Sequence, residues 1–314
     1  MSANATVVGP AVHPPLVLLV HEASVLYVRP VVAFVRRQLA LHAGRAPAYL
    51  ECTEVAQYVP APGSVVFVVG DGFSGFTRVP GCHYVFVNFS LVRRLRWWRP
   101  ASPAALRWMH AKRRALLAKR GQFDMVLDFH PRQSQWLKDA LAPVRVAAFA
   151  TAVEDARCDA PPVPLAERRW DVGFTGTESP RRARLRAQLE GRGLAVSPAF
   201  APGFDTVVHQ SRLVLNVHFA ACDTLEAPRV VHTLTAGVCL VTEPCLGLAD
   251  VAPPSCYVTS SYGRIADTVT ALLQDTQRIE GIARAAASHM RAHHAPRARE
   301  SWRAIVRDAL ELQP

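Results

Sequence analysis

Short, almost wholly apolar runs recur along this chain of 314 residues, and each run stops at a polar residue. The first covers residues 16–20 and is followed by His21 and Glu22. Runs without polar alternation predict strands covered on both faces, as in a parallel sheet. Between the runs lie stretches of ten or more residues with helical spacing. This alternation predicts βαβ units and an α/β fold.

In the first half, we expect strands at residues 16–20, 64–69, 83–88, 125–129 and 144–149. A helix is expected over residues 25–44, where apolar residues are spaced for one helical face and a glycine follows. Pro30 must lie near the start of that helix, because a proline farther inside would kink it. A basic helical stretch covers residues 103–120.

The second half restarts the pattern, with strands expected at residues 170–174, 213–218 and 238–242. Helices are expected after Ser179, which can cap the first, and then at residues 228–236, 265–274, 277–293 and 297–312. The stretch 151–169 has several prolines and no period, which predicts a linker. We therefore expect a disordered tail (1–15), an N-terminal domain (16–150), a C-terminal domain (170–296) and a closing helix (297–314).

Composition narrows the classes of protein. Half of the residues are hydrophobic, which is enough for a core in each domain, and the net charge is +11. Such a charge can attract the phosphates of a small ligand, nucleic acid or an anionic membrane. The seven cysteines are an odd number and no export signal is expected, which argues for reduced thiols in a cytoplasm. They form no CxxC pair, and their spacing does not suggest zinc. The run at residues 16–20 is too short to span a bilayer.

Open parallel sheets bind ligands at the carboxyl ends of their strands. This rule selects candidates before any family is considered. In the first half they are His21, Glu22, Asp71, Asn88 and His130. In the second half they are Thr175–Thr177, His218 and Glu243.

One cluster of interest is the turn at residues 175–177 and the helix that follows it. A strand, a turn of small residues and a helix N-terminus form an anion site, since free N–H groups and the helix dipole face the ligand. Arg181 and Arg182 in the first turn oppose the dipole, and a bound diphosphate would offset that cost. The alternative is an ordinary strand–helix turn with solvated arginines.

A second cluster comprises Asn216, His218, Glu226 and Arg229. Pro228 suits the first turn of a helix, so Glu226 lies just before that turn, where a carboxylate is favoured and can accept hydrogen bonds from ribose hydroxyls. Arg229 offers a planar guanidinium suited to a phosphate. The alternative is a capped helix with a surface Glu–Arg pair.

Three stretches of the second half together resemble a known group. They are WDVGFTG with the arginines after it, LNVHFAACDTLEAPRVVHTLTAGVCLVTE, and ASHMRAHHAPRARESW. They are similar to the start of the C-terminal domain, the donor-side signature and the closing helix of bacterial glycosyltransferase-B proteins related to the spore-maturation protein group. The resemblance covers about residues 170–310, and residues 1–150 carry no comparable signature.

The resemblance implies two Rossmann-like domains facing across a cleft, the GT-B fold. It also implies that the C-terminal domain binds a nucleotide-sugar donor and that no metal or other cofactor is required. Glu226 and Arg229 would contact the ribose or the diphosphate, and Thr175–Thr177 the phosphates. The donor-side candidates are Thr175, Gly176, Thr177, Arg181, Arg182, Asn216, His218, Glu226, Arg229, His232 and Glu243.

One departure from the family pattern concerns His232. Many glycosyltransferase-B proteins have a Glu five residues before the glycine of this helix, where this chain has His232. Either Glu226 takes over the ribose contact, or donor use is altered or lost.

The expected activity is therefore glycosyl transfer, hexosyl or a related class, to an unknown saccharide, lipid-linked saccharide or protein. Arginines and backbone N–H groups would stabilise the departing phosphate. An inverting enzyme also needs a base, for which His21 and Asp71 are the candidates. A buried structural histidine and a turn-forming aspartate are the alternatives for these two residues.

Two other functions stay open. One is a catalytically inactive nucleotide-sugar-binding protein of the same fold. The other is a protein that binds or modifies nucleic acid. The basic stretch 93–120, which contains Trp97 and Trp98, favours this function. The same tryptophans suit peripheral contact of a cytoplasmic protein with a membrane. His289 and His293 share a helix face, but no carboxylate joins them, so no metal site is expected.

Overall fold

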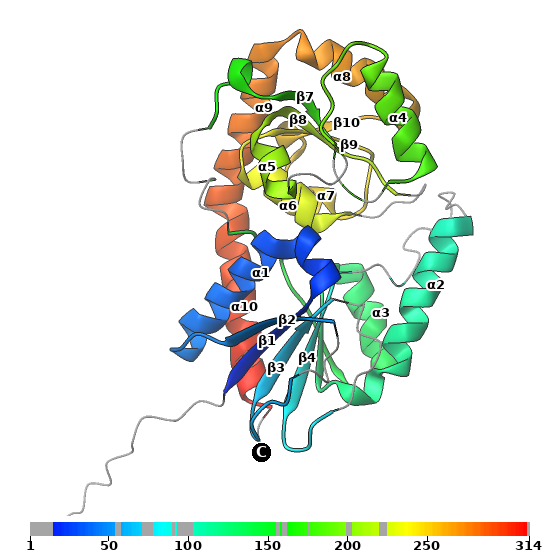
Figure 1. Ribbon diagram of the computed structural model, residues 1–314. Helices are drawn as coiled ribbons and strands as arrows, with labels where there is room; N and C mark the ends of the chain where they lie inside the picture. Colours follow the sequence, from blue (N-terminus) through cyan, green and yellow to red (C-terminus); the bar gives the residue numbers. More distant parts are fainter. Residues whose placement is uncertain are drawn as a thin grey trace, which may run out of the picture.

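Two parallel sheets form the centre of the protein, one below the other in Figure 1. The structure is a computed structural model that describes residues 15–53, 58–70, 78–89, 92, 103–154, 158, 162–174, 176, 178–198, 203–219 and 225–312. Every strand pair within the two sheets is parallel. The predicted α/β class is confirmed.

The N-terminal sheet has the strand order β2-β1-β3-β4-β5-β6. Its strands are β1 (Leu16–His21), β2 (Ala48–Cys52), β3 (Val65–Val69), β4 (His83–Asn88), β5 (Met125–Asp128) and β6 (Arg145–Ala148). The order reverses between β1 and β3, which in doubly wound sheets is where ligands bind. Strand β2 was not predicted, because its AYLEC sequence at the sheet edge mixes polar and apolar residues.

Helices cover both faces of this sheet, which explains its apolar runs. Alternate residues of β1 point to opposite sides: Leu18 lies in the core under α1 (Glu22–Ala43) and α10 (Ala295–Leu310), and Leu19 in the core under α3 (Pro131–Leu141). Helix α2 (Pro103–Ala118) lies on the α3 side, where Leu116 joins the core. A strand buried on both faces needs no polar alternation.

Helix α1 corrects one expectation. It begins at Glu22, directly after β1, so Pro30 lies well inside it rather than near its start. The helix bends along its length in Figure 1. Proline lacks the N–H for the helical hydrogen bond and its ring displaces the preceding turn. The Pro30 carbonyl accepts a hydrogen bond from the Glu154 N–H at 2.9 Å, so the segment that follows β6 contacts the helix here.

The C-terminal sheet has the order β10-β9-β8-β7. Its strands are β7 (Trp170–Gly173), β8 (Ser211–Asn216), β9 (Cys239–Thr242) and β10 (Val258–Thr259). The helices around it are α4 (Pro180–Glu190), α5 (Phe204–His209), α6 (Ala227–Thr235), α7 (Leu248–Val251), α8 (Ile265–Leu273) and α9 (Thr276–His289). Sequence analysis did not predict α3, α5, α7 or β10. The last three are short, and short elements carry little periodicity.

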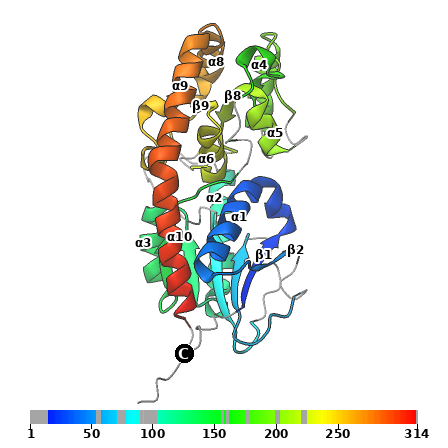
Figure 2. The same cartoon turned by 90° about the vertical axis from the view of Figure 1, so that its left-hand side faces the viewer.

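A long helical run joins the two sheets on one side, as Figure 2 shows. Helix α9 continues through a π-helical turn, Met290–His294, into α10, where the sequence predicted two separate helices. Helix α10 packs against α1, and Trp302 is fully buried. In the π turn, Nε2 of His294 lies 2.7 Å from the carbonyl oxygen of Thr151. Among the described residues, every helix is too short or too polar to cross a bilayer.

Candidate functional site

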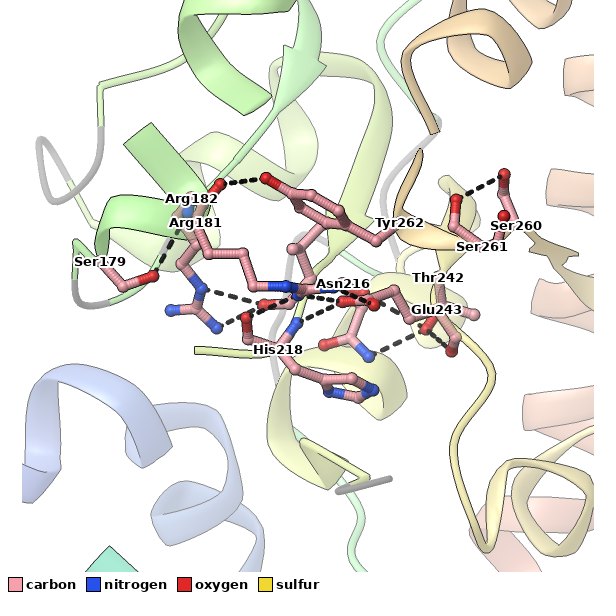
Figure 3. Close-up of polar contacts among 11 residues, drawn as sticks. Ser179, Arg181, Arg182, Asn216, His218, Thr242, Glu243, Ser260, Ser261 and Tyr262 are labelled. Atoms are coloured by element: carbon pink, nitrogen blue, oxygen red, sulfur yellow. Dashed lines mark hydrogen bonds and ion pairs between the residues drawn. The ribbon is translucent and has the colours of Figure 1, made fainter. Parts of the chain in front are cut away.

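The carboxyl ends of β7, β8 and β9 bring most of the predicted donor-side residues together, as Figure 3 shows for several of them. Three arginines converge here from two helices, Arg181 and Arg182 from α4 and Arg229 from α6. They face two carboxylates, those of Glu226 and Glu243. We call these five residues the arginine–carboxylate network.

Helix α4 starts as predicted. Ser179 is its N-cap, and its Oγ accepts a hydrogen bond from the Arg182 N–H at 3.3 Å, with Pro180 in the first turn. Capping fixes the start of the helix a few residues after Gly176. The two arginine side chains therefore leave the helix beside its positive end.

Arg181 makes a two-pronged ion pair with Glu243. Its Nη1 donates to Oε2 of Glu243 at 2.6 Å, and its Nη2 donates to Oε1. The guanidinium also lies on the ring of Tyr262, with Cζ 3.8 Å from the ring centroid, and the Tyr262 hydroxyl donates to the Arg181 carbonyl at 2.7 Å. Glu243 accepts a further hydrogen bond from the His218 N–H at 2.9 Å. Glu243 thus holds the edge of this guanidinium, and the Tyr262 ring covers one of its faces.

Arg182 and Arg229 share the carboxylate of Glu226. Nη2 of Arg182 lies 2.8 Å from Oε1, and Nη1 of Arg229 lies 2.5 Å from Oε2. Arg182 is buried and also donates through Nε to the Val217 carbonyl at 2.9 Å. Arg229 donates to Oδ1 of Asn216 at 3.1 Å. The sequence left open a Glu226–Arg229 pair at the surface. The structure contains this pair, but as part of a larger and largely buried cluster.

Gly176 lies directly against these arginines. A Cβ built on it would lie 2.5 Å from Nη2 of Arg229 and 2.6 Å from Nη1 of Arg182, and its φ is +117°. Only glycine adopts such a φ easily and leaves that space. The described residue of the predicted phosphate turn thus contacts two guanidiniums. Thr175 and Thr177 lie outside the described residues.

Side-chain hydrogen bonds join the ends of β8 and β9 next to the network. Nδ2 of Asn216 donates to Oγ1 of Thr242 at 2.9 Å, and that hydroxyl donates to the Glu243 carbonyl at 2.9 Å. All three residues are buried. These bonds hold Asn216 with its Oδ1 toward Arg229.

Charge in the network follows from burial and pairing. Burial by itself would raise the pKa of Glu226, but Arg229 and Arg182 outweigh it and hold that pKa below its usual value. Burial lowers the pKa of Arg229 to about 10, so it stays charged at neutral pH. Three guanidiniums therefore face two carboxylates, and positive charge is in excess. Burial also lowers the pKa of His218, so its imidazole is neutral near pH 7.

The first-half candidates lie at the carboxyl ends of the N-terminal strands. His21 ends β1, and its Nδ1 accepts a hydrogen bond from the Ala23 N–H at 3.2 Å, so it caps α1. A Cβ on Gly70, just after β3, would lie 3.0 Å from Cβ of His21. These two residues therefore mark the strand-order reversal between β1 and β3. Asp71, the second proposed base, lies outside the described residues.

The ends of the two sheets meet at His130, which follows β5. Its Nε2 and the Leu225 side chain each lie 3.4 Å from the position of a Cβ on Gly247. Leu225 and Gly247 belong to the loops after β8 and β9. The carboxyl ends of both sheets therefore face one another, which places the strand-end candidates of both halves on facing edges.

His232 lies elsewhere on α6. It is fully buried, and its ring centroid lies 5.2 Å from that of Phe204 and 6.1 Å from that of His209. Sequence reasoning missed Tyr262 and Thr242. Tyr262 follows β10, a two-residue strand that leaves almost no sequence signal, whereas Thr242 ends β9, one position before the predicted Glu243.

Comparison with known proteins was made by sequence and by structure. No protein-family model and no curated protein matches the sequence. Among solved structures, HepE of Anabaena, with UDP and glucose, matches with a TM-score of 0.58 at 10% identity over 95% of this chain and all of its own. Sucrose-phosphate synthase of Thermosynechococcus elongatus matches with a TM-score of 0.54 at 12% identity, covering 95% of this chain and 98% of its own. The fold is GT-B.

A larger protein, TarM of S. aureus, is also similar to this chain in structure. A TarM mutant in complex with Fondaparinux, alpha-GlcNAc-glycerol and UDP matches with a TM-score of 0.55 at 10% identity over 79% of this chain. Our chain spans about half of that protein, 55% of its length. The predicted pair of Rossmann-like domains is confirmed as a GT-B fold, and the likeness at this identity concerns the fold alone.

Proposed function

We propose that the protein transfers a sugar from a nucleoside diphosphate sugar to an acceptor hydroxyl. One observation carries this proposal: Arg182 and Arg229, held by Glu226, converge with the N-terminus of α4 around Gly176. A diphosphate needs several fixed N–H donors and positive charge at short range. The network supplies both at the carboxyl edge of a parallel sheet.

The ion pairs of Glu226 also suggest how the donor is bound. Glu226 keeps the guanidiniums of Arg182 and Arg229 in position. An incoming diphosphate takes over those guanidiniums, together with the turn at residues 175–177, and leaves Glu226 to accept hydrogen bonds from ribose hydroxyls. Glu243 keeps Arg181 in place next to them.

The same positive charges assist cleavage of the bond between the sugar and the diphosphate. When the bond between the sugar and the phosphate breaks, negative charge grows on the departing diphosphate. Arg229 and Arg182 stabilise that charge from fixed positions, which lowers the barrier without a divalent metal or another cofactor. His21 or Asp71 takes the proton of the acceptor hydroxyl if the reaction inverts the sugar.

The donor is proposed to carry UDP. Similar structures were solved with UDP or with UDP-glucose, HepE and TarM among them. The proposed acceptor is a saccharide, a lipid-linked saccharide or a protein, as expected from the sequence. A cytoplasmic location with peripheral membrane contact, and kinship with the spore-maturation group, also remain proposals.

The decisive experiment measures binding and turnover together. We expect UDP or another nucleoside diphosphate, at about a hundred times its dissociation constant, to add roughly 2.7 kcal/mol of stability in a thermal-shift assay. Glu226→Ala and Arg229→Ala should weaken this response. Arg192→Ala, which removes an ion pair with Asp267 on the surface, is the control and should not. Hydrolysis or transfer of the sugar, followed by mass spectrometry with and without EDTA, tests turnover and metal independence.

Two outcomes would favour the alternatives. Binding of nucleotide sugars without hydrolysis or transfer would support an inactive binding protein. The absence of a response to any diphosphate, with nucleic-acid binding that falls steeply as salt rises, would favour a nucleic-acid protein and overturn the proposal.

A further inference from the structure

Three metal-binding side chains meet where the linker contacts the C-terminal domain. Cys158 comes from the linker, His209 from the last residue of α5 and His232 from the middle of α6. One ligand atom of each lies within 4.8 Å of the others. These residues are far apart in sequence, so no local spacing motif could have predicted their meeting. We call them the Cys–His–His cluster.

The chemistry of the cluster suits Zn²⁺. A thiolate and two imidazoles form a donor set that zinc prefers over the harder cations. In a tetrahedral site with Zn–S near 2.3 Å and Zn–N near 2.0 Å, one sulfur and two nitrogens lie about 3.3–3.6 Å apart. Each of the three therefore needs to move by no more than about 1 Å to close around an ion.

The surroundings of the cluster favour a fixed site. His232 is fully buried, whereas Cys158 and His209 are half-buried, so an ion can enter from the side of the last two. The Phe204 ring lies against His232 and provides an apolar wall. An apolar shell limits the access of solvent to a metal site and lowers the local dielectric.

We propose that Cys158, His209 and His232 bind one Zn²⁺, which fastens the linker to α5 and α6. A water molecule completes the tetrahedron. Three ligands from three separate segments restrain the linker against the donor-side domain. Helix α6 also carries Arg229, and α1 packs against both α5 and α6. The ion therefore stabilises the helix that holds the arginine–carboxylate network, whether or not the protein transfers sugars.

Cobalt substitution tests this proposal directly. The full-length protein is stripped with a chelator under reducing conditions and titrated with Co²⁺. We expect one Co²⁺ per chain, visible d–d bands of a tetrahedral site and a near-ultraviolet thiolate-to-cobalt charge-transfer band. Zn²⁺ should displace the cobalt, abolish these bands and raise the melting temperature.

Variants assign the ligands. Cys158→Ser should abolish the charge-transfer band. His209→Gln should weaken Co²⁺ binding by at least about a hundredfold, the upper end of what loss of a supporting outer-shell partner costs. Both side chains are half-buried, so these two variants keep the test valid if His232→Gln fails to fold.

Two matched controls distinguish this site from adventitious binding. Cys245→Ser removes another half-buried thiol, and His293→Gln disrupts the His289–His293 pair, whose rings lie 5.2 Å apart. Neither should change the spectrum. The proposal is overturned if Co²⁺ gives no charge-transfer band, or if Cys158→Ser and His209→Gln bind Co²⁺ as tightly as the unaltered protein.

Discussion

Gly176 lies against the guanidinium of Arg229. A Cβ on Gly176 would stand 2.5 Å from Nη2 of Arg229, which is too close for two non-bonded atoms. This contact links the turn after β7 to helix α6. Because Arg229 is itself held by Glu226, it cannot withdraw without breaking an ion pair. The positions of the Arg229 and Arg182 guanidiniums therefore depend on the absence of a side chain at position 176.

Gly176→Ala should impair nucleotide binding as well as stability. The left-handed φ would strain an alanine by about 1–3 kcal/mol, and the added Cβ would displace Arg229 and Arg182. Isothermal titration with UDP and urea unfolding measure the two effects. Gly193→Ala is the control, because Gly193 has a φ of +78° but no heavy atom within 4 Å of an added Cβ. It should lose stability and keep UDP binding; equal binding by both variants would contradict the assigned contact.

Ser179→Ala should loosen the start of α4. Loss of an N-cap hydrogen bond costs about 1 kcal/mol, and here it also frees the turn that positions Arg181 and Arg182. Asp275→Ala is a matched comparison, since Asp275 caps α9 by accepting from the Arg278 N–H at 2.9 Å. We expect both variants to lose similar stability in urea unfolding, and only Ser179→Ala to weaken UDP binding. Weakening by both would point to a general effect of stability.

The Arg181–Glu243 pair should be strongly coupled. Its side chains are only 19% and 10% exposed, so water screens their attraction little. A double-mutant cycle with alanine at each position should give a coupling energy of about 1–3 kcal/mol in urea unfolding. The pair Arg192–Asp267, with 31% and 66% exposure, is the comparison and should give about 0.5 kcal/mol or less. Equal coupling in the two cycles would show that the first pair is as solvated as the second.

The contribution of Asp128 to the free energy of unfolding should fall as pH rises. Burial raises its pKa from 3.8 to about 6, although Gln133 and Asn88 donate hydrogen bonds to it. The folded state therefore binds the proton more tightly than the unfolded state, and this contribution to stability is complete below pH 3.8 and lost as pH rises through about 6.

Asp128→Asn removes that titration. The unfolding free energy of the variant minus that of the unaltered protein should increase by up to about 3 kcal/mol between about pH 4 and pH 7. A constant offset is also expected, because the new amide group faces donors, but it does not change with pH. Chemical unfolding at several pH values measures the difference. A difference that is flat across this window would contradict the raised pKa.

Much of the fold could be predicted from single segments. Strands such as β1, β3 and β4 are apolar on both faces because helices cover both sides, and this burial leaves an unambiguous run in the sequence. Strand β2, at the sheet edge, lacks such a run and was missed. The start of α1 was misplaced, because the spacing of apolar residues does not reveal how a helix accommodates Pro30.

The candidate site, like the fold, could be predicted only in part from the sequence. The sequence by itself determined that Ser179 caps α4, and that Glu226 lies just before α6 with Arg229 in its first turn, because these are relations within one turn. Only the tertiary structure decided that Arg182 shares Glu226, that Arg181 pairs with Glu243, and that a linker cysteine meets two histidines. Such contacts join segments far apart in the chain. They depend on strand order and helix packing, which no local pattern encodes.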